Sequence, residues 1–416
     1  GGPIDDASPS REAESAAIAA DGIEDGDEER IPQLPSIAYP TWVAALVDRV
    51  QTAVADVPGA SVRAFGSAVN GFGDAASDVD LVLAASKASL VKTLGLGRVS
   101  KRDLPARALS NLQSRLRRQG FRILERVLHA KVPILKMSCG GLECDLSLNN
   151  LLPVFNTRLL KAYADIDERV VTIAQACKKW AREQGHHGAQ YGHLSSYAFT
   201  LMVIFYMQVR GALPCLQEWG QEFPEFYSEG ARTFNVAMDE DKMSGRWQKP
   251  HPGPVVSFHD FLRFFANEFQ WGEWVVSVRT GKCLSPESFP KLKMKPRDGT
   301  TSEQWKWMIH IEDPFDIERN LNCVLAPRHN EGLWLALSKA ADAKPPKIPE
   351  VNGQEYPELA SNRVWRSSQR KPQKQQQHVA AQEGPEKSDA HSYAMPAEQK
   401  AGGFRGRMGP RTQAVV

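Results

Sequence analysis

The chain has 416 residues, of which 42% are hydrophobic, and its formal net charge at pH 7 is +2. This length is typical of two or three domains, and the apolar content is sufficient for a sizeable core, which excludes a chain that is disordered throughout. The near-neutral charge combines an acidic beginning with a basic end, so the total does not indicate a partner.

Cysteine spacing and hydropathy exclude two further classes of protein. The six cysteines include no Cys-x-x-Cys pair, so neither a zinc site nor a disulfide framework is predicted. The longest apolar run, residues 197–209, contains Thr200 and Gln208 and is too short to span a bilayer, so we expect a buried helix and no membrane partner. Unpaired cysteines favour a cytoplasmic location, with a nuclear or organellar one as the alternative. The chain begins with Gly1-Gly2 and not with Met, so we expect a fragment or a processed form.

The first 155 residues are predicted to form a disordered tail and an α+β catalytic domain. Residues 1–35 are rich in acidic residues, Ala and Gly and contain little to bury, which is typical of disorder. In residues 36–155, a helix-spaced pattern leads to a strand around residues 62–65, and a mostly helical stretch follows at 89–119. Three more predicted strands complete a small mixed sheet, at residues 121–128, 131–138 and 142–148.

From residue 156 to residue 340 the pattern changes to long helical periodicity, which predicts a second, mainly α-helical domain. Its predicted helices cover residues 158–163, 167–184, 195–209 and 258–269. We expect loops in the Pro-, Gly- and charge-rich residues 218–254, a short strand at 274–279 and a turn at 309–316. Residues 341–416 are rich in Pro, Gln, Lys and Ser and end in an Arg-Gly stretch, so a disordered basic tail is predicted.

Two acidic residues follow a Gly-Ser pair in the predicted catalytic domain. Asp78 and Asp80 are separated by one residue, so on a strand both carboxylates lie on one face while the apolar residues between and after them face a core. Gly66 allows close backbone approach to a phosphate, and Ser67 offers a hydroxyl and an amide for phosphate oxygens. The pattern predicts a site where a metal ion and a phosphate meet, with a solvated strand end as the alternative.

A third carboxylate strengthens the metal-site interpretation. Asp145 lies in an alternating segment, residues 142–148, that places it on the face opposite Leu146 and Leu148. A two-metal centre needs about three carboxylates on neighbouring strands, because two cations roughly 3.5–4 Å apart must be bridged and neutralised. The candidate metal ligands and catalytic residues are therefore Asp78, Asp80 and Asp145, and their hard oxygens favour Mg²⁺, with Mn²⁺ as an alternative.

Six further segments, in the same order along the chain, resemble the RNA terminal nucleotidyltransferases of the DNA polymerase β-like superfamily. This family includes terminal uridylyltransferases and cytoplasmic-type poly(A) polymerases, and the resemblance covers roughly residues 40–330. Beside the Gly-Ser and Asp-x-Asp signature and the third acid, it rests on Asn149-Asn150, Asn156-Thr157, Ala176-Cys177-Lys178-Lys179-Trp180-Ala181-Arg182, Leu194-Ser195-Ser196-Tyr197, Val278-Arg279-Thr280-Gly281-Lys282 and Ile311-Glu312-Asp313-Pro314-Phe315. It implies a polymerase-β-like catalytic domain followed by a helical, poly(A) polymerase-associated domain.

The resemblance implies a set of residues that binds the nucleotide. Lys178 and Arg182 are four residues apart and so share a helical face, and with Ser67 and Ser196 they are implied to hold the triphosphate. The family's usual residue at the second position is Lys, and Arg182 keeps the charge while adding a fork that suits phosphate. The pattern alone leaves a solvated basic face as the alternative. Tyr197 is implied to stack on the base, with ordinary packing at a helix start as the alternative.

Recognition of the ribose is implied one helix earlier. Asn156 matches a family asparagine that binds the ribose 2′-hydroxyl and so selects ribonucleotides, and Thr157 is its neighbour in the motif. From the residues alone, either side chain can instead cap a helix that begins just before Arg158. Both interpretations remain open at the level of sequence.

The residues that are implied to face the base leave the choice of nucleotide open. Asp313 and Asp316 match two acidic positions that face the base edge in uridylyltransferases, and a carboxylate can accept from uracil N3–H or from the adenine amino group. Three residues later several uridine-adding relatives carry a histidine that excludes adenine, whereas this chain has Arg319. Its donors suit a uracil carbonyl oxygen better than an adenine amino group, so UTP is favoured and ATP stays the alternative.

The predicted activity is template-independent addition of ribonucleotides, UMP in first place, to an RNA 3′ end. The RNA 3′-hydroxyl would attack the α-phosphate with release of pyrophosphate, with Asp145 beside that hydroxyl. The predicted partners are RNA, UTP or ATP, and a protein that supplies RNA specificity, since only basic stretches such as residues 115–118 suggest RNA contacts. The alternatives are a poly(A) polymerase, an inactive RNA-binding scaffold and a nucleotidyltransferase of small molecules or proteins. Retention of three acids argues against the scaffold, and the segment around Asp313 argues against the last class.

Overall fold

The structure is a computed structural model in which residues 33–73, 77–219, 223–238, 247, 250, 253–294 and 307–341 are described. The chain divides into two units, Gly1–Glu358 and Leu359–Val416, and every described residue lies in the first. The predicted disordered tails fall outside the described residues except at their inner ends. The predicted boundaries between the domains stay predictions, and the one at residues 155 and 156 falls inside a helix.

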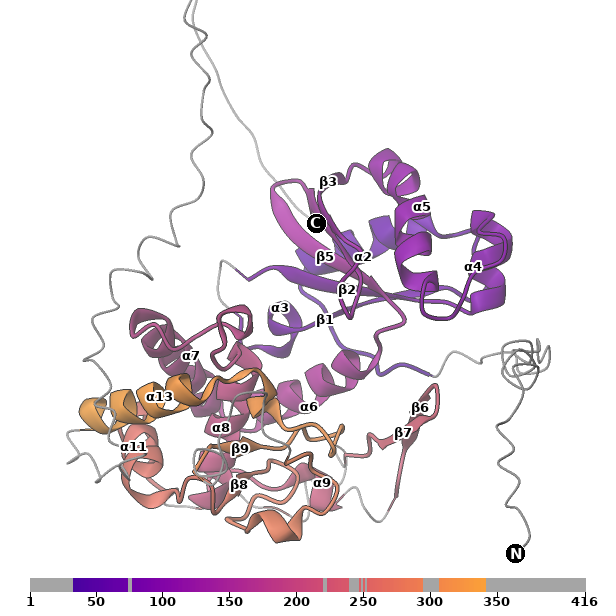
Figure 1. The fold of residues 1–416 in the computed structure, drawn as a ribbon. Coiled ribbons are helices and arrows are strands. Elements are labelled where there is room, and N and C mark those ends of the chain that lie inside the picture. The colour runs from indigo at the N-terminus through magenta and orange to yellow at the C-terminus, as the bar shows by residue number, and fades with distance from the viewer. Residues whose placement is uncertain are drawn as a thin grey trace, which may run out of the picture. The chain divides into compact units, whose positions relative to one another are not determined.

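A five-stranded mixed sheet forms the first part of the fold (Figure 1). The strands lie in the order β1-β2-β5-β4-β3, with β2 and β5 parallel and all other neighbours antiparallel. Their bounds are β1 Ser61–Phe65, β2 Val79–Ala84, β3 Arg122–Val127, β4 Ile134–Cys139 and β5 Leu142–Leu148. The predicted α+β class is confirmed, and so are the three strands expected between residues 121 and 148.

The interior strand β2 is largely buried on both faces, and the alternation of its residues places Asp80 on one face and the apolar residues Val79, Leu81 and Leu83 on the other. Val79, Leu81 and Leu83 are buried in a core with residues of the helices at positions 41–53, 87–94 and 104–118. Val82 and Ala84 lie in a second core, with the helices that follow the sheet in the chain. The helices of this part are α2 Thr41–Ala53, α3 Ser67–Asn70, α4 Lys87–Leu94, α5 Leu104–Arg118 and α6 Leu152–Ile166. The predicted inward orientation of Val79, Leu81 and Leu83 is therefore confirmed, and the even-numbered residues share the opposite face.

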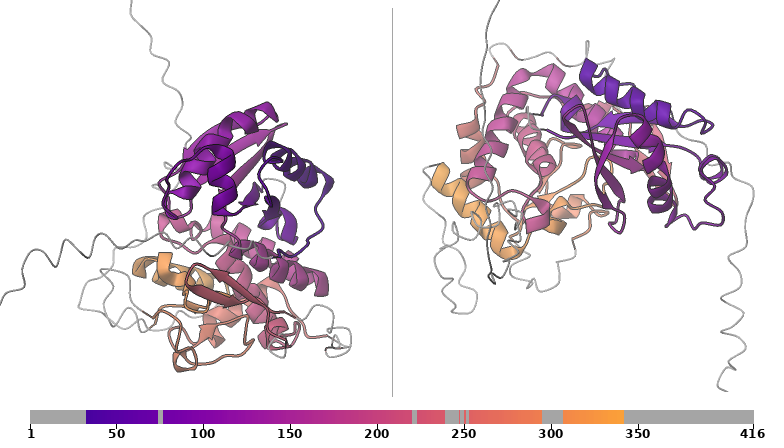
Figure 2. Two further views of the ribbon diagram at one scale, coloured as in Figure 1. Left: turned by 90° about the vertical axis from the view of Figure 1, so that its right-hand side faces the viewer. Right: turned by 90° about the horizontal axis from the view of Figure 1, so that it is seen from above.

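Helices dominate the remainder of the described chain, as two further views show (Figure 2). The apolar helix expected from the longest hydrophobic run is α8, and it is buried on all sides from residue 198 to residue 208. The elements are α7 Glu168–Glu183, a short turn at Ala189–Tyr191, α8 Ser196–Val209, α9 Leu216–Trp219, α11 Phe258–Arg263 continuing into a π-turn at Phe264–Glu268, β8 Val275–Val276, a turn at Pro286–Ser288, β9 His310–Ile311, a turn at Leu321–Val324 and α13 Pro327–Ala340. Among the described helices, none combines the length and apolarity that crossing a bilayer requires.

The loops predicted for residues 218–254 are wrong in part, because a β-hairpin lies there. Strands β6 (Phe226–Glu229) and β7 (Arg232–Asn235) pair antiparallel. Tyr227 of this hairpin stacks on Phe234 across the two strands and on Phe155 of α6, with ring centroids 5.9 and 5.3 Å apart. The contact with α6 is a tertiary one, so the composition of the hairpin itself does not reveal it.

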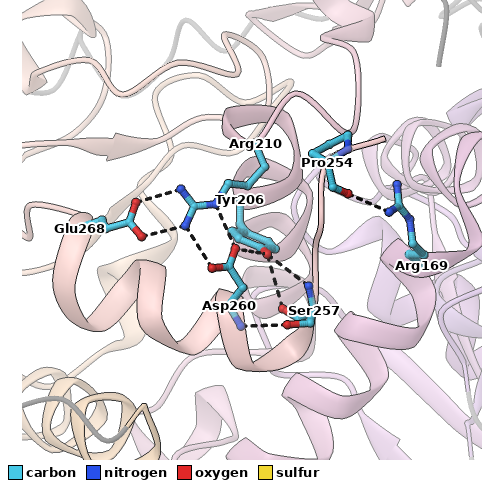
Figure 3. A network of polar contacts seen from close by, with 7 residues as sticks. All are labelled: Arg169, Tyr206, Arg210, Pro254, Ser257, Asp260 and Glu268. Atoms are coloured by element: carbon cyan, nitrogen blue, oxygen red, sulfur yellow. Dashed lines mark hydrogen bonds and ion pairs between the residues drawn. The ribbon is translucent and has the colours of Figure 1, made fainter. Parts of the chain in front are cut away.

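A polar network joins α8 to α11 (Figure 3). Arg210, at the end of α8, binds both carboxylate oxygens of Glu268 at 2.8 Å and the Asp260 carboxylate at 3.0 Å. The Tyr206 hydroxyl donates to the same Asp260 at 2.6 Å, and the Ser257 hydroxyl accepts from the Asp260 amide at the start of α11. These contacts hold the buried helix α8 against residues 257–268, which form α11 and its π-turn. Helix α8 begins with the Ser196-Tyr197 motif.

Candidate active site

Two of the three predicted acids lie on adjacent strands of the sheet, and the third, Asp78, directly precedes β2. In the parallel pair β2 and β5, Asp80 stands directly opposite Asp145, and Asp78 lies two residues before Asp80. Asp80 shares its face of β2 with Val82 and Ala84, which pack against the helices that follow the sheet. The register therefore brings the predicted ligands together at one end of β2, as a shared metal site requires.

Gly66 packs directly against one of these acids. A β-carbon at Gly66 would lie 2.4 Å from Asp80 Oδ2, and the backbone there has φ 80° and ψ −161°, a conformation that is essentially restricted to glycine. Thr157 of α6 holds this turn, because its hydroxyl accepts from the Gly66 amide at 2.9 Å and donates to the Pro153 carbonyl at 2.7 Å. Ser67 follows as the first residue of the short helix α3. The Gly66 turn, directly after β1, is thus in contact with the Asp80 carboxylate on one side and with Thr157 of α6 on the other.

The clustering of acids changes their protonation. Burial, together with the neighbouring Asp145 and Asp78, raises the pKa of Asp80 to about 7. Burial and the same kind of repulsion, from Asp145 and Glu143, raise the pKa of Asp78 as well. Lys136 of β4 donates to Asp145 Oδ2 at 3.0 Å and opposes these shifts. A cation bound between the carboxylates would relieve the same repulsion.

The donor chemistry of this cluster fits a divalent cation. All three side chains offer hard oxygens, which Mg²⁺ and Mn²⁺ prefer, and they come from β5, from β2 and from the residue directly before β2. Within the described ranges, no three His, Cys, Asp or Glu side chains already converge on one point, and Asp145 is instead bound to Lys136. The residues fit the metal. Lys136 contacts Oδ2 of Asp145, so the Oδ1 atom would be the one offered to the metal.

The pKa of Asp80 predicts that Mg²⁺ stabilises the protein more strongly at higher pH. Its folded pKa, about 7, exceeds the value of 3.8 expected for an unfolded chain. The metal-free fold therefore holds this proton more tightly than the unfolded chain, and it loses stability as the pH rises from about 4 to about 7. Because metal and proton compete, millimolar Mg²⁺ should raise the melting temperature more at about pH 8 than at about pH 6. An Asp80→Asn variant should lose this difference, and equal shifts of the wild-type protein at both pH values would contradict the assignment.

The basic residues predicted to hold phosphate lie on α7, beside the loop that leads from α3 to Asp78. Lys178 is buried and donates to the Phe72 carbonyl at 2.5 Å, and Gln175, three residues earlier, donates to the Gly73 carbonyl at 2.9 Å. Arg182 is exposed one turn later on α7. The loop before the first acid is thus tied to the helix that carries the candidate phosphate-binding cations.

The second phosphate-binding motif begins α8. Ser195 caps the helix by accepting from the Ala198 amide, so Ser196 is the first helical residue, as predicted. His187 Nε2 lies 2.8 Å from Ser196 Oγ, and the pKa of this histidine is lowered by burial and by the nearby Arg182 and Lys178. His187 is therefore close to three of the predicted triphosphate ligands, namely Lys178, Arg182 and Ser196.

Asn156 lies inside a helix and not at its end. Because α6 begins at Leu152, with Pro153 in its first turn, the alternative that Asn156 or Thr157 caps a helix before Arg158 is wrong. Asn156 Oδ1 is buried and has no hydrogen-bond partner in the part of the chain that the structure describes. It is available to a ligand, whereas the Thr157 hydroxyl already serves the Gly66 turn, and contact of either residue with a nucleotide stays a prediction.

The predicted base-edge residues form one tight turn. Asp313 is fully buried, and its Oδ1 accepts from the amides of Phe315 and Asp316 at 3.2 and 3.1 Å. Its Oδ2 has no hydrogen-bond partner among the described residues and lies 3.8 Å from an Arg319 guanidinium nitrogen. Burial raises the pKa of Asp313 to about 6, and burial together with this aspartate raises the pKa of Tyr197. Asp313 is therefore next to the residue predicted to stack on the base.

The sequence interpretation missed three residues that the structure places against this set. Lys136 binds Asp145, His187 binds Ser196, and Arg232 of the hairpin forms an ion pair with Asp316. Lys136 lies opposite Asp145 in the antiparallel pair β4 and β5, so a correct register would have revealed it. No local signal marks His187 or Arg232, because both partners come from other elements.

The predicted RNA contact at residues 115–118 is partly engaged in structural contacts. Arg115 binds Asp56, and with it the last turn of α5 is held against the end of α2. Next to Arg117 is an open groove of about 500 Å³ whose lining residues are Gln113, Arg117, Ile123, Leu124, Glu125 and Arg126. Contact of this basic stretch with RNA stays a prediction.

Two family descriptions match the two parts of the described fold. Residues 40–165 match the central palm domain of mitochondrial-like poly(A) RNA polymerase, and residues 256–319 match the Cid1 family poly A polymerase. The first range contains the three acids and Asn156, and the second contains Asp313, Asp316 and Arg319. Both matches therefore fall on the predicted site residues.

The curated relatives include two kinds of enzyme, which by their names add different nucleotides to RNA. The chain is 34% identical over 284 residues to human terminal uridylyltransferase 7, which covers 65% of this chain and 17% of that protein. It is 31% identical over 264 residues to the poly(A) RNA polymerase GLD2 of Danio rerio, which covers 62% of this chain and 49% of that protein. The chain thus spans about half the length, or less, of the curated relatives that it matches.

Solved structures agree with the fold. The structure of Cid1 in complex with its short product ApU is similar with a TM-score of 0.55 and 22% identity, covering 75% of this chain and 92% of Cid1. At this identity the likeness concerns the fold alone. Family matches, relatives and fold point to one group, whose members depend on divalent metal ions. The chain therefore carries a palm domain like that of mitochondrial-like poly(A) RNA polymerase and a Cid1-family poly A polymerase domain, and it is similar to terminal uridylyltransferases and GLD2 poly(A) polymerases.

Proposed function

We propose that the chain adds ribonucleotides to RNA 3′ ends without a template, using UTP in preference to ATP. The observation that carries this proposal is the register of β2 and β5, which places Asp80 opposite Asp145 beside the Gly66 turn. Support comes from the uridylyltransferase and poly(A) polymerase relatives and from the family matches over residues 40–165 and 256–319. The ATP-using alternative is favoured by the GLD2 relatives.

The metal would be held by Asp78, Asp80 and Asp145, and Mg²⁺ suits their oxygens best. When bound, divalent ions activate the attacking hydroxyl and stabilise the leaving pyrophosphate. Asp145 lies opposite Asp80 on β5, where its carboxylate would accept the proton of the RNA 3′-hydroxyl. Gly66 leaves room for Asp80 at the turn that presents Ser67 to a phosphate.

The helical residues would bind and orient the triphosphate. Lys178 and Arg182 supply positive charge from α7, and Ser196 supplies a hydroxyl that His187 orients. Tyr197 offers an aromatic face for the base, and base stacking tolerates any base, so it contributes affinity more than selectivity. Asn156 supplies a buried acceptor for the ribose hydroxyl.

The base preference rests on donors near the buried Asp313. Arg319 offers only hydrogen-bond donors, which match a uracil carbonyl oxygen and oppose the adenine amino group. The carboxyl of Asp313, with its pKa near 6, is ionised in most molecules at neutral pH and can accept from uracil N3–H. The same carboxylate can accept from the adenine amino group, so the preference for UTP rests on the donors of Arg319.

The experiment that tests this proposal offers each ribonucleoside triphosphate separately to the purified protein with Mg²⁺ and a short single-stranded RNA. We expect the other three nucleotides to support weaker RNA extension than UTP does. For ATP the rate should be lower by about tenfold or more, which is the discrimination that one good base contact provides. ATP use equal to or above UTP use would reverse the base assignment. An Arg319→His variant then reports whether that position takes part in the choice.

A further inference from the structure

The β6–β7 hairpin places an arginine on one of the two base-edge acids. The Arg232 guanidinium forms an ion pair with Asp316 Oδ1. The Asp316 side chain is 11% exposed, whereas Arg232 is 49% exposed, so the acid is covered and the arginine still faces solvent. The same guanidinium carbon lies 4.8 Å from the centre of the Phe234 ring, which limits where the arginine can point.

The hairpin that carries Arg232 is anchored beside the candidate ribose-binding residue. Tyr227 stacks between Phe234 and Phe155, and Phe155 directly precedes Asn156 on α6. Glu225, just before β6, forms a 3.1 Å ion pair with Arg158 of the same helix. Helix α6 therefore sets the positions of both Asn156 and the arginine.

Each acid of the base-edge turn has its own arginine. Asp313 faces Arg319, and Asp316 is bound to Arg232, so the negative charge of each of these two side chains is matched by a neighbouring positive one. Asp316 donates its backbone amide to Asp313 Oδ1, and the Arg319 amide closes the turn on the Asp316 carbonyl at 2.7 Å. The Asp313 carboxylate therefore cannot move without a change in the turn, whereas the Asp316 carboxylate is held by Arg232.

The pairing changes what the base edge can recognise. An ionised carboxylate only accepts hydrogen bonds, whereas a guanidinium only donates them. A free Asp316 would accept from the exocyclic amino groups of adenine and cytosine, but here Arg232 binds its Oδ1 and places a competing donor beside the carboxylate. Arg232 has five N–H donors in all and is half exposed, so donors remain for a carbonyl oxygen such as uracil O4.

Resting on the proposed function, we infer that Arg232 is a specificity-determining residue, which covers Asp316 and thereby disfavours nucleotides whose base carries an amino group at this edge. The effect requires no change in the phosphate or metal site.

The test compares wild-type protein and an Arg232→Ala variant in RNA extension with UTP, CTP and ATP, each measured as kcat/KM. UTP and CTP have rings of the same size, so the ratio between them isolates hydrogen bonding from fit. We expect the UTP-to-CTP and UTP-to-ATP ratios to fall about tenfold or more in the variant, since the released carboxylate accepts from amino groups. An additional Asp316→Asn substitution should restore the ratios toward the wild-type values, because it removes that acceptor.

Two controls separate this effect from a structural one. Arg232→Lys keeps the charge and should retain most of the UTP preference. Lys293→Ala removes a cation that binds Glu318 at 3.2 Å, two residues beyond Asp316, and should leave the ratios unchanged. An equal loss with all three nucleotides in Arg232→Ala would overturn the inference and leave the hairpin with a structural role. Failure of the wild-type protein to extend RNA with any nucleotide would instead refute the proposed function itself.

Discussion

The variant with both Asp78→Ala and Asp80→Ala is expected to lose RNA extension by at least about 10³-fold while its fold is retained. Two of the three candidate ligands disappear, and with them several kcal/mol of charge stabilisation in the transition state. Each 1.36 kcal/mol corresponds to about tenfold in rate. Incorporation of labelled UMP into a short RNA, with a melting curve of the same sample, measures both properties.

The fold of this double variant should be at least as stable as that of the wild-type protein in the absence of metal. Burial and the repulsion among the acids raise the pKa of Asp80, so its ionised form opposes folding above about pH 7. Glu143→Ala is the matched control, because Glu143 is an exposed acid on β5, two residues before Asp145. That control should keep its activity within about threefold, since surface substitutions are generally mild. A double variant that still extends RNA at the wild-type rate would remove the metal-site assignment.

Gly66→Ala is expected to lower kcat/KM by about 100-fold or more and to reduce stability by about 1–3 kcal/mol. The new β-carbon would meet Asp80 Oδ2 at 2.4 Å, and the backbone conformation there suits only glycine. The turn must shift, and a displacement of about 1 Å at a reacting centre is enough for such a loss. Single-turnover extension and chemical unfolding report the two effects separately.

Gly59→Ala provides the control for backbone strain in this experiment. Gly59 also has a positive φ, 69°, but nothing lies within 4 Å of the position that its β-carbon would take. We therefore expect a loss of stability of a similar kind with no loss of activity. If Gly59→Ala and Gly66→Ala reduced activity equally, close approach to Asp80 would not be the reason for a glycine at position 66.

The alternation of residues was sufficient to predict the fold around the acids. Period-two spacing placed Asp78 and Asp80 on one face with Val79 inside, and the same rule placed Asp145 opposite Leu146. Helical spacing predicted α2, α7 and α8 with small errors at their ends. These features depend on local periodicity, which a single sequence displays directly.

Contacts that depend on strand register or on distant elements were not predictable. The pairing of Asp80 with Asp145 requires the register of two strands that lie far apart in the chain. Thr157 was assigned to the nucleotide or to a cap, yet its hydroxyl holds Gly66, 91 residues away. The helix-cap alternative for Asn156 overlooked Pro153, since proline favours the first turn of a helix.

The base-edge chemistry shows the same limit. Asp313, Asp316 and Arg319 were predicted from one short motif, but the partner of Asp316 comes from a hairpin more than eighty residues earlier. That hairpin lies in a segment expected to be loops, and its aromatic residues are ordered by Phe155 of α6. Base selection therefore depends on tertiary contacts more than on the motif itself.

The most direct test of the central claim measures where the nucleotide goes. Wild-type protein is incubated with Mg²⁺, UTP and either an RNA that ends in a 3′-hydroxyl or the same RNA with a 3′-deoxy end, and RNA length and pyrophosphate are followed together. Nucleotidyl transfer to RNA predicts one pyrophosphate released for each nucleotide added, with the 3′-deoxy RNA left unextended. Pyrophosphate release without RNA extension, or label attached to the protein or to a small molecule, would contradict it.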